Sequence, residues 1–463
     1  MNIYIHTYGC RMNLVDSEVI ASILSKAGMT VVESIGSADF VLLNSCSVRE
    51  DGHDAVRCFI SKIEEDHGLS KRVIITGCFA TQLDKCSAKE LGHSVSAVIT
   101  PGQYELLPAV LRQIKDNPDS LIMVGGDDSV CELYENHLPS RLFEDKTTAA
   151  VTIAKGCNQK CTYCIEPITR GEEHCKSPEA IFREVEDICR NGYRELTLVG
   201  HCVDKYQWSN ADGAVIGFAE LLDSIAERFP KIRIKFLSSH PTFYSDEILT
   251  TVCRHNNIMK VVHLPVQSGS DSVLHRMGRG YDVAHFEKRV AEIRRMCPDM
   301  AIITDIMVGF CGETDADFEQ TYQLVERMGF NDINVFKYSM RPGTAAHKLF
   351  TDDVPEDVKE ERFQAIIALR DQIKESLNQA KVGQTVKIII EKVNEIMEIQ
   401  QTPWLTLNIY RIYGRDQYNN NVWYEVRTNA QFGLSEDELV NTVEEVPIFR
   451  ATKNELIGYE FEC

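Results

Sequence analysis

The sequence lacks any run of about 18 consecutive apolar residues, so no segment is predicted to cross a membrane. Its amino terminus has neither the basic region nor the long apolar region of a signal peptide, and we expect a cytoplasmic protein. Basic residues are in deficit, with 49 Lys and Arg against 69 Asp and Glu, a net charge of −20. This deficit argues against a broad, non-specific nucleic-acid-binding surface, but it is compatible with one basic face on an acidic body.

Cysteine, by contrast, is abundant, with 16 in a chain of 463 residues. Without a secretory signal, so many thiols indicate metal binding, catalysis or redox chemistry rather than a disulfide framework. The length corresponds to two to four domains at roughly 100–200 residues each.

Short apolar runs alternate with amphipathic helical segments in the first part of the chain. Strands are predicted at 3–7, 40–43, 73–76 and 97–99, and helices at 15–27, 51–66 and 103–115. This alternation is typical of a doubly wound parallel sheet, which we expect over residues 1–120. Residues 121–146 carry few periodic runs and are predicted to be a connector.

A second alternating series begins near residue 149. Its predicted strands are 149–154, 195–199, 233–237, 260–265, 301–308 and 332–338. Six units in about 190 residues fit a partial (β/α)6 TIM-like barrel, because eight units typically take ~250. With a long helix at 356–379, this domain is predicted over residues 147–380.

From residue 381 the pattern changes to strands separated by Gly and Asn turns. Strands are predicted at 385–391, 406–410, 422–427 and 446–451, which indicates a small all-β barrel over residues 381–463. Residues 382–463 hold seven basic and thirteen acidic side chains, whereas an RNA-contacting module should show a basic stripe.

The most specific motif is CxxxCxxC at Cys157, Cys161 and Cys164, directly after the first predicted barrel strand. Chemistry in α/β barrels is located at the carboxyl ends of the strands. Three closely spaced thiolates suit an iron–sulfur cluster and would leave one of four irons open to another ligand. The alternative is a zinc site, but zinc prefers four ligands in two paired clusters.

Three further cysteines, Cys10, Cys46 and Cys78, each follow a predicted strand of the amino-terminal sheet. The carboxyl ends of parallel strands share one edge, so these distant residues could converge on a second cluster. The alternative is three ordinary buried thiols.

These motifs together resemble a known family. The CxxxCxxC loop is similar to that of radical S-adenosylmethionine (SAM) enzymes. The segments Tyr8–Asn13, Asn44–Arg49 and Thr76–Cys78 resemble the amino-terminal domain of the radical SAM methylthiotransferases. The resemblance implies two 4Fe-4S clusters: a radical SAM cluster on Cys157, Cys161 and Cys164, and an auxiliary cluster on Cys10, Cys46 and Cys78.

The resemblance also implies the reaction. One SAM would donate a methyl group, a second would be the source of the 5′-deoxyadenosyl radical, and the auxiliary cluster would carry the sulfur. The segments Thr169–Glu173, His263–Asp271 and Tyr338–Thr344 resemble the branch that methylthiolates carbon 2 of N6-isopentenyladenosine (N6-dimethylallyladenosine) at tRNA position 37. The all-β tail resembles the family's TRAM module, which contacts RNA.

Other substrates remain open at this point. Alternatives are N6-threonylcarbamoyladenosine in tRNA, a ribosomal-protein side chain, and a non-catalytic iron–sulfur RNA-binding protein. The sequence also departs from the branch: Gly200-His201-Cys202-Val203-Asp204 stands where Gly-Gln-Asn-Val-Asn is usual, and Cys311 replaces a proline.

By resemblance, Tyr163 is predicted to lie near the SAM adenine. Gln267 and Asp305 are predicted to contact SAM or the base from the ends of the fourth and fifth barrel strands. The implied partners are the tRNA anticodon stem-loop, an electron donor such as flavodoxin, and a sulfur source. The remaining cysteines are predicted to be packing or incidental surface thiols: Cys58, Cys86, Cys131, Cys175, Cys189, Cys202, Cys253, Cys297, Cys311 and Cys463.

Overall fold

The computed structural model describes residues 1–47, 51–126, 134–141, 147–210, 212–402, 405–429 and 433–461. Cys131 and Cys463, as well as Val48 and Arg49 of the Cys46 motif, lie outside the described residues. No helix in the described ranges is both long and apolar enough to span a bilayer.

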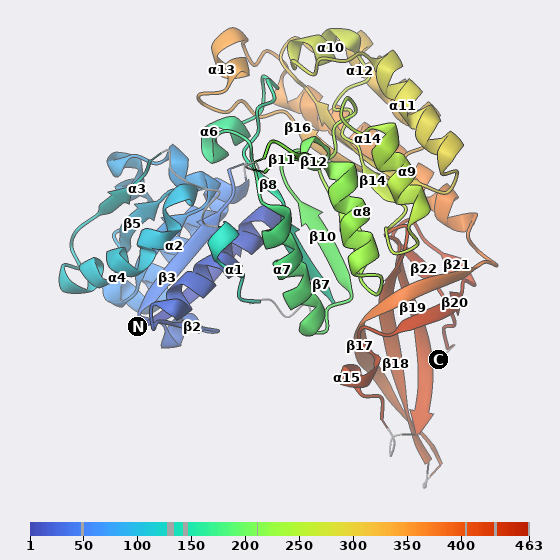
Figure 1. Ribbon diagram of the computed structural model, residues 1–463, viewed down its shortest axis with the longest axis horizontal. Helices are drawn as coiled ribbons and strands as arrows, with labels where there is room; N and C mark the ends of the chain where they lie inside the picture. Colours follow the sequence, from blue (N-terminus) through green and yellow to red (C-terminus); the bar gives the residue numbers. More distant parts are fainter. Residues whose placement is uncertain are drawn as a thin grey trace.

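The amino-terminal part is a six-stranded parallel sheet in the order β2-β1-β3-β4-β5-β6. Its strands are β1 (Asn2–Tyr8), β2 (Thr30–Val32), β3 (Phe40–Ser45), β4 (Arg72–Thr76), β5 (Val95–Ile99) and β6 (Ile122–Val124). Helices α1 (Arg11–Lys26) and α4 (Leu107–Asp116) cover one face, and α2 (Asp51–His67) and α3 (Lys85–Leu91) cover the other (Figure 1). The doubly wound prediction is therefore confirmed, and β6 extends the sheet into the segment expected to be a connector.

Alternation along the strands explains why both faces are covered. Leu42 and Ile74 join the core under α1 and α4, whereas Leu43 and Ile75 join the core under α2 and α3. Successive side chains of a strand point to opposite faces, so a continuous apolar run such as 40–43 requires a layer on each side.

The central part contains six parallel strands in the order β7-β10-β13-β14-β15-β16. They are β7 (Thr148–Thr152), β10 (Glu195–Val199), β13 (Arg233–Phe236), β14 (Val261–His263), β15 (Ala301–Val308) and β16 (Asp332–Lys337). The intervening helices are α7 (Pro178–Arg190), α8 (Phe218–Arg228), α9 (Asp246–Arg254), α11 (Val283–Met296), α12 (Asp315–Met328) and α14 (Glu356–Gln379). Among the described residues β7 and β16 do not pair, so the barrel is open, as the count of six units predicted.

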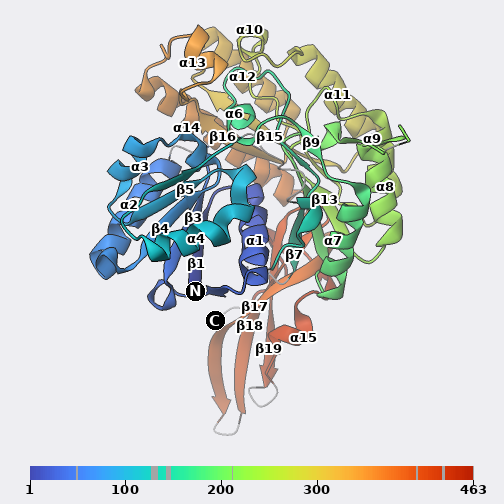
Figure 2. The same cartoon turned by 60° about the vertical axis from the view of Figure 1, so that its left-hand side comes forward.

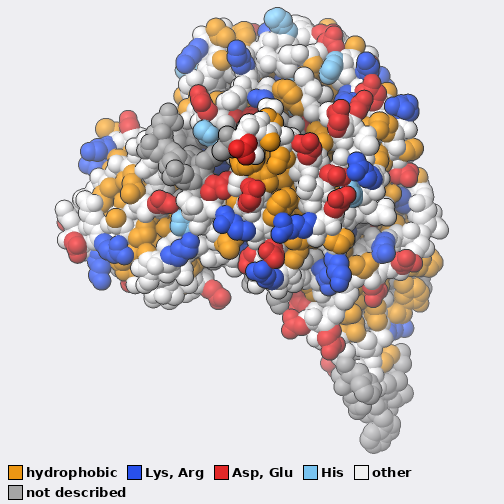
Figure 3. Space-filling view, in the orientation of Figure 1, with side chains coloured by type: hydrophobic (Ala, Val, Ile, Leu, Met, Phe, Trp, Pro, Cys, Tyr) orange, Lys and Arg blue, Asp and Glu red, His pale blue; other side chains and the backbone are white. Residues whose placement is uncertain are grey.

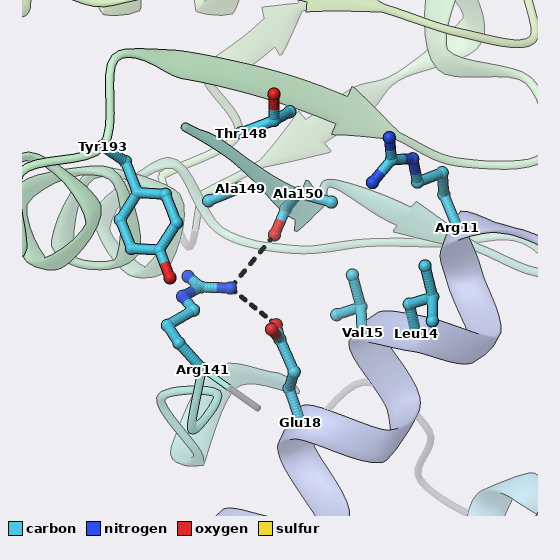
Figure 4. A pocket seen from close by; sticks show the side chains of 9 residues that line it. All are labelled: Arg11, Leu14, Val15, Glu18, Arg141, Thr148, Ala149, Ala150 and Tyr193. Atoms are coloured by element: carbon cyan, nitrogen blue, oxygen red, sulfur yellow. Dashed lines mark hydrogen bonds and ion pairs between the residues drawn. The ribbon is translucent and has the colours of Figure 1, made fainter. Parts of the chain in front are cut away.

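The amino-terminal sheet is joined to the open barrel edge through α1, which packs against β7 (Figure 2). Figure 4 shows Arg141 between the two: its Nη1 donates to Glu18 Oε2 on α1 at 2.7 Å and to the Ala150 carbonyl of β7 at 3.4 Å. Its Nη2 lies 3.4 Å from Glu184 Oε1 of α7. This largely enclosed cation therefore links α1 of the amino-terminal part to β7 and α7 of the barrel.

The carboxyl-terminal part is a curled, mostly antiparallel sheet in the order β20-β17-β18-β19-β22-β21. Its strands are β17 (Thr385–Thr402), β18 (Leu405–Asp416), β19 (Asn421–Asn429), β20 (Val443–Pro447), β21 (Arg450–Ala451) and β22 (Glu455–Ile457). The single strand predicted at 446–451 is wrong, because the chain bends after Pro447. Since β20 and β21 form opposite edges but only two residues separate them, the sheet must roll round its core.

This sheet packs on the amino-terminal ends of the barrel strands. Arg415 Nη2 donates to Thr148 Oγ1 at 3.2 Å, and the Lys260 N–H donates to the Gln417 carbonyl at 3.0 Å. The carboxyl-terminal sheet therefore lies at the end of the barrel opposite the CxxxCxxC loop (Figure 1). Lys and Arg are interspersed with Asp and Glu over the face in Figure 3, without a large region of one sign.

Candidate functional site

The cysteines of the amino-terminal sheet follow three neighbouring strands. Cys10 caps α1 after β1, Cys46 follows β3, and Cys78 begins a 3-10 helix after β4. The Cys46 N–H donates to the Tyr8 carbonyl at 3.1 Å, and the Cys10 and Cys46 side chains are in hydrogen-bond contact. The charges of Cys10 and Cys78 are close enough to interact. The structure therefore brings the three predicted residues together at the carboxyl edge of the sheet.

Two glycines allow the strand ends to approach. Gly77 has φ +83°, and a Cβ there would lie 2.3 Å from Asn44 Oδ1. A Cβ on Gly9, at φ +142°, would lie 2.7 Å from the Cys46 Cβ. Only glycine fits such positions without moving the cysteines.

The protonation of these thiols differs with their surroundings. The hydrogen bond with Cys46 lowers the pKa of Cys10 to about 6. Burial raises the pKa of Cys78 to about 12, although the neighbouring Arg170 opposes the shift. Arg170 Nε donates to the Cys78 sulfur at 3.0 Å. A metal ligand must be a thiolate, so this guanidinium is the group that can stabilise Cys78 in its ligating form.

The barrel cysteines lie on a loop that is anchored on both sides. The Cys157 N–H donates to the Gly171 carbonyl at 3.2 Å, and the Thr162 N–H donates to the Met277 carbonyl at 2.9 Å. Gly156, at φ +73°, approaches so closely that a Cβ would lie 1.8 Å from the Glu172 carbonyl oxygen. Cys157, Cys161 and Cys164 are mutually close enough for their charges to interact.

The donor sets fit iron–sulfur clusters by their chemistry. Each set offers three cysteine thiols that carry no disulfide. Three thiolates can hold a 4Fe-4S cluster and leave one iron open, whereas structural zinc sites take four protein ligands.

A single helical turn, α6 (Glu166–Arg170), joins the two triads. Arg170 contacts Cys78, while the charge of Glu166 acts on Cys164 and also on Cys10 and Cys78. The two cysteine sets therefore face a common region, although they belong to different sheets.

Beneath α6 lies a fully buried charge network centred on Asp16. Its carboxylate accepts hydrogen bonds from Arg170 at 2.5 Å, Lys155 at 2.9 Å, Tyr134 at 2.6 Å and Tyr104 at 3.1 Å. Burial alone would raise the pKa of Asp16, but Arg170 and Lys155 hold it below its usual value. Because a buried charge is tolerated only when it is paired, this network fixes the sheet and the barrel in one arrangement.

Tyr163, Gln267 and Asp305, the predicted SAM or base contacts, lie inside or at the rim of the barrel. Tyr163 accepts a hydrogen bond from Arg279 Nη1 at 3.3 Å. Gln267 is buried with φ +77°, held by backbone hydrogen bonds to Asp305 and Met307 of β15. Asp305 Oδ1 accepts from His263 Nε2 at 2.8 Å, and an adjacent strand supplies a second donor, Asn334 Nδ2 at 2.9 Å.

Arg279 contacts a cysteine of the barrel loop, as Arg170 contacts a cysteine of the amino-terminal sheet. Its Nη1 donates to the Cys161 sulfur at 3.3 Å, and its Nη2 donates to the Pro265 carbonyl at 3.0 Å. Each triad thus has one buried arginine in contact with one of its sulfurs.

The segment that departs from the family pattern lies at the same rim. His201 Nε2 is 3.0 Å from Glu166 Oε2. The Cys202 thiol donates to Asp204 Oδ1 at 3.2 Å, and the His240 N–H donates to Asp204 Oδ2 at 2.6 Å. Burial raises the pKa of Asp204 to about 7 and lowers the pKa of His240 to about 3.

Several buried polar atoms around the two triads have no hydrogen-bond partner in the described part of the chain: Ser47 Oγ, Arg170 Nη2, His201 Nδ1, Ser239 Oγ and His240 Nε2. A buried polar atom without a hydrogen bond destabilises the protein unless a bound ligand supplies the missing partner. The region therefore fits polar, sulfur-rich cofactors.

The remaining described cysteines do not join either triad. Cys311 is buried among Phe310, Tyr338 and Ala346, which is a packing environment. Cys253 and Cys297 contact each other between α9 and the end of α11. Cys202 is close enough to Cys157 for their charges to interact, although its thiol is bound to Asp204.

Sequence reasoning did not predict Asp16, Glu166, Arg170 or Arg279 as functional residues. Arg170 lies in the segment Thr169–Glu173, which carried the family resemblance and was the available signal for it. Arg170 and Arg279 each contact a cysteine. Their cysteine partners are 92 and 118 residues away, so only the fold reveals the contacts.

Comparisons with known proteins agree with this geometry. The family model "Radical SAM superfamily" matches residues 151–325, and "Uncharacterized protein family UPF0004" matches residues 2–100. The chain is 37% identical to the tRNA-2-methylthio-N(6)-dimethylallyladenosine synthase of Bacteroides thetaiotaomicron, over 92% of this chain and 91% of that protein. It is 36% identical to the protein of the same name in Porphyromonas gingivalis, over 91% and 89%.

Solved structures share the fold at low identity. The radical SAM methyltransferase TsrM of Kitasatospora setae aligns with a TM-score of 0.52 and 13% identity, over 74% of this chain and 76% of that one. The cobalamin-dependent radical SAM enzyme OxsB aligns with a TM-score of 0.52 and 12% identity, over 80% and 56%. At this identity the likeness concerns the fold alone.

Proposed function

The chain belongs to the family of tRNA-2-methylthio-N(6)-dimethylallyladenosine synthases, which are radical SAM enzymes, and from this premise we propose its reaction and its site. It transfers a methylthio group to carbon 2 of N6-isopentenyladenosine at tRNA position 37. One observation carries the site assignment: two cysteine triads, from the sheet and from the barrel, face one region across α6.

We propose that Cys157, Cys161 and Cys164 hold the radical SAM cluster, and that Cys10, Cys46 and Cys78 hold an auxiliary 4Fe-4S cluster. With SAM bound, these groups supply the carbon-centred radical and the transferable sulfur. The proposed division of the chain is 1–120 for the auxiliary-cluster domain, 147–380 for the barrel and 381–463 for a TRAM-like module. Residues 121–146 would connect the first two.

The chain's own residues position these groups. Arg170 donates to Cys78 and opposes the rise of its pKa on burial, and Arg279 donates to the sulfur of Cys161. Polar atoms of His201, Ser239 and His240 line the rim, where a methionine moiety or a base requires hydrogen bonds. Tyr163, Gln267 and Asp305 are proposed to contact SAM or the base.

The target base must leave the anticodon-loop stack to enter between the two triads. The buried Asp16 network holds the sheet and the barrel in a fixed relative position. We therefore propose that the site forms without domain closure.

The TRAM-like tail is proposed to add little to tRNA affinity. Four of the seven basic side chains in residues 382–463 are ion-paired: Arg411 with Glu425, Arg415 with Glu391, Arg450 with Glu460, and Lys453 with Asp371. Paired cations release few counterions when they meet phosphate, and binding by this module should therefore be weak. A low-potential electron donor such as flavodoxin and a sulfur source are required by the reaction.

Nucleoside mass spectrometry tests this function. Loss of the gene should abolish 2-methylthio-N6-isopentenyladenosine in tRNA and accumulate its unthiolated precursor. The wild-type protein should restore the product, and Cys157→Ala should not. An unchanged level of the product would reject the substrate and direct the search to the threonylcarbamoyl nucleoside and to ribosomal proteins.

A further inference from the structure

Arg170 has an arrangement of donors that its contacts within the chain do not explain. Its side chain is 1% exposed. Its Nη1 donates to Asp16 Oδ2 at 2.5 Å, and its Nε donates to the Cys78 sulfur at 3.0 Å. Its Nη2 is buried and has no partner among the residues that the structure describes. A buried guanidinium donor without an acceptor is expensive, so an acceptor outside the protein chain is expected.

The geometry of the guanidinium shows where that acceptor lies. The group is a rigid planar fork in which Nε–H and one Nη2–H point in parallel from the same edge. The Nε–H is already aimed at the Cys78 sulfur, so the free Nη2–H is aimed at the space beside that sulfur. Asp16 holds the opposite edge and, with Lys155 as its second cation, prevents the fork from rotating.

The ligand chemistry of iron indicates which acceptor lies beside a ligating thiolate. An iron bound to Cys78 would carry further sulfur atoms, and anionic sulfur accepts N–H hydrogen bonds. We propose that Arg170 is a positioning residue of the auxiliary cluster, holding the Cys78 sulfur with Nε–H and donating Nη2–H to a second sulfur on the same iron centre. This inference rests on the proposed function, because it requires an auxiliary cluster on Cys10, Cys46 and Cys78.

A consequence for electron transfer follows. Hydrogen bonds to cluster sulfurs stabilise the reduced, more negative state and therefore raise the reduction potential. Lysine preserves the positive charge and can still pair with Asp16, but it cannot provide two parallel donors. Arg170→Lys should therefore lower the midpoint potential of the auxiliary cluster without a change of formal charge.

The experiment uses the full-length chain carrying Cys157→Ala, Cys161→Ala and Cys164→Ala, so that only the auxiliary cluster remains. In this parent, Arg170→Lys is compared with Arg141→Lys, a matched control. Arg141 also lies between the sheet and the barrel, with 11% of its side chain exposed, and its hydrogen bonds reach Glu18, Ala150 and Glu184 rather than a thiol. Each protein is reconstituted anaerobically and titrated by electron paramagnetic resonance, and release of iron to a chelator is timed.

The expected result is a lower potential and faster iron release for Arg170→Lys, with Arg141→Lys equal to the parent. Titrations with and without added inorganic sulfide identify the acceptor. A shift without added sulfide places the acceptor among the cluster's own sulfides, as proposed. A shift that occurs only with added sulfide would overturn the proposal, because the extra sulfur binds the open iron and not the iron of Cys78.

A second measurement does not depend on the folding of the Arg170 variant. In the parent labelled with 15N-arginine, pulsed paramagnetic resonance of the reduced cluster should detect a guanidinium nitrogen coupling. A missing coupling, or an unchanged potential in a folded and iron-loaded Arg170→Lys protein, overturns the proposal. A parent that binds almost no iron would instead overturn the auxiliary cluster itself, so the two failures are distinguishable.

Discussion

His201 Nε2 lies 3.0 Å from Glu166 Oε2, which links the end of β10 to the helical turn that joins the two cysteine triads. Burial would raise the pKa of Glu166, but His201 beside it holds that pKa below its usual value. The family's usual residue at position 201 is glutamine, and its amide could also donate to this carboxylate. The departure at this position therefore keeps a polar partner beside Glu166, although Glu166 Oε2 has no hydrogen bond among the described residues.

Replacing His201 tests whether a donor is what the position requires. His201→Ala leaves the Glu166 carboxylate without this partner, which should cost about 1–3 kcal/mol and lower the thermal midpoint. His201→Gln should cost less than about 1 kcal/mol, because the amide replaces the lost donor. Differential scanning calorimetry of the reconstituted variants measures both. Equal midpoints for the two variants would show that the pair contributes nothing.

Asp204 should make stability depend on pH. Burial raises its pKa from 3.8 to about 7, so the folded state holds its proton more tightly than the unfolded state. The sign follows: this contribution is fully present below pH 3.8 and is lost as pH rises to about 7. The limit is about 4 kcal/mol for a shift of about three pKa units.

Asp204→Asn removes that titration and restores the residue usual in the family. Between about pH 5 and pH 8, the thermal midpoint of the wild type should fall more than that of Asp204→Asn. Above about pH 8, the plots of thermal midpoint against pH should run parallel for the two proteins. The carbonyl oxygen of the substituted amide can still accept from the His240 N–H, so the local structure is kept. Parallel curves throughout the range would mean that Asp204 is already ionised at about pH 5.

Helices and strands could be predicted where the periodicity of the apolar residues agrees with the capping residues at the ends of the element. The long helix predicted at 356–379 begins and ends at the predicted residues. In contrast, α6 spans five residues inside the loop region, too short for a periodic signal, although it makes the central contacts of the site. The strand β17 runs to Thr402 rather than 391, because its outer half is a largely exposed hairpin in which few apolar side chains mark a face.

In the site, too, features set by local sequence could be predicted, whereas contacts between distant segments could not. Strand ends on one sheet edge were enough to predict that Cys10, Cys46 and Cys78 meet, because topology determines that edge. The contact of Arg170 with Cys78 depends on how a barrel loop docks on a separate sheet. No local pattern encodes such a contact, so it could not be derived from the residues alone.

The junction of sheet and barrel should be sensitive to Arg141. Arg141→Met removes a cation shared by the buried carboxylates of Glu18 and Glu184, and breaking a buried pair costs about 3–5 kcal/mol. We expect the lower part of that range because Lys176 still pairs with Glu184 at 2.5 Å. The exposed pair of Arg190 and Glu186 is the control, and Arg190→Met should change stability by less than about 1 kcal/mol. Equal effects of the two substitutions in thermal unfolding would contradict the assignment.

Glycine substitutions should empty the two triads one at a time. An alanine Cβ at Gly77 would meet Asn44 Oδ1 at 2.3 Å, and at Gly156 it would meet the Glu172 carbonyl at 1.8 Å, so each should displace only its own cysteines. Wild type should bind about eight irons and each variant about four. Gly192→Ala is the matched control, because Gly192 has φ +85° but nothing within 4 Å of the added Cβ. It shares the positive φ of Gly77 and Gly156 and should retain about eight irons. If Gly77→Ala retained full iron, the sheet cysteines would not be ligands, and if Gly156→Ala emptied both sites, the triads would not load independently.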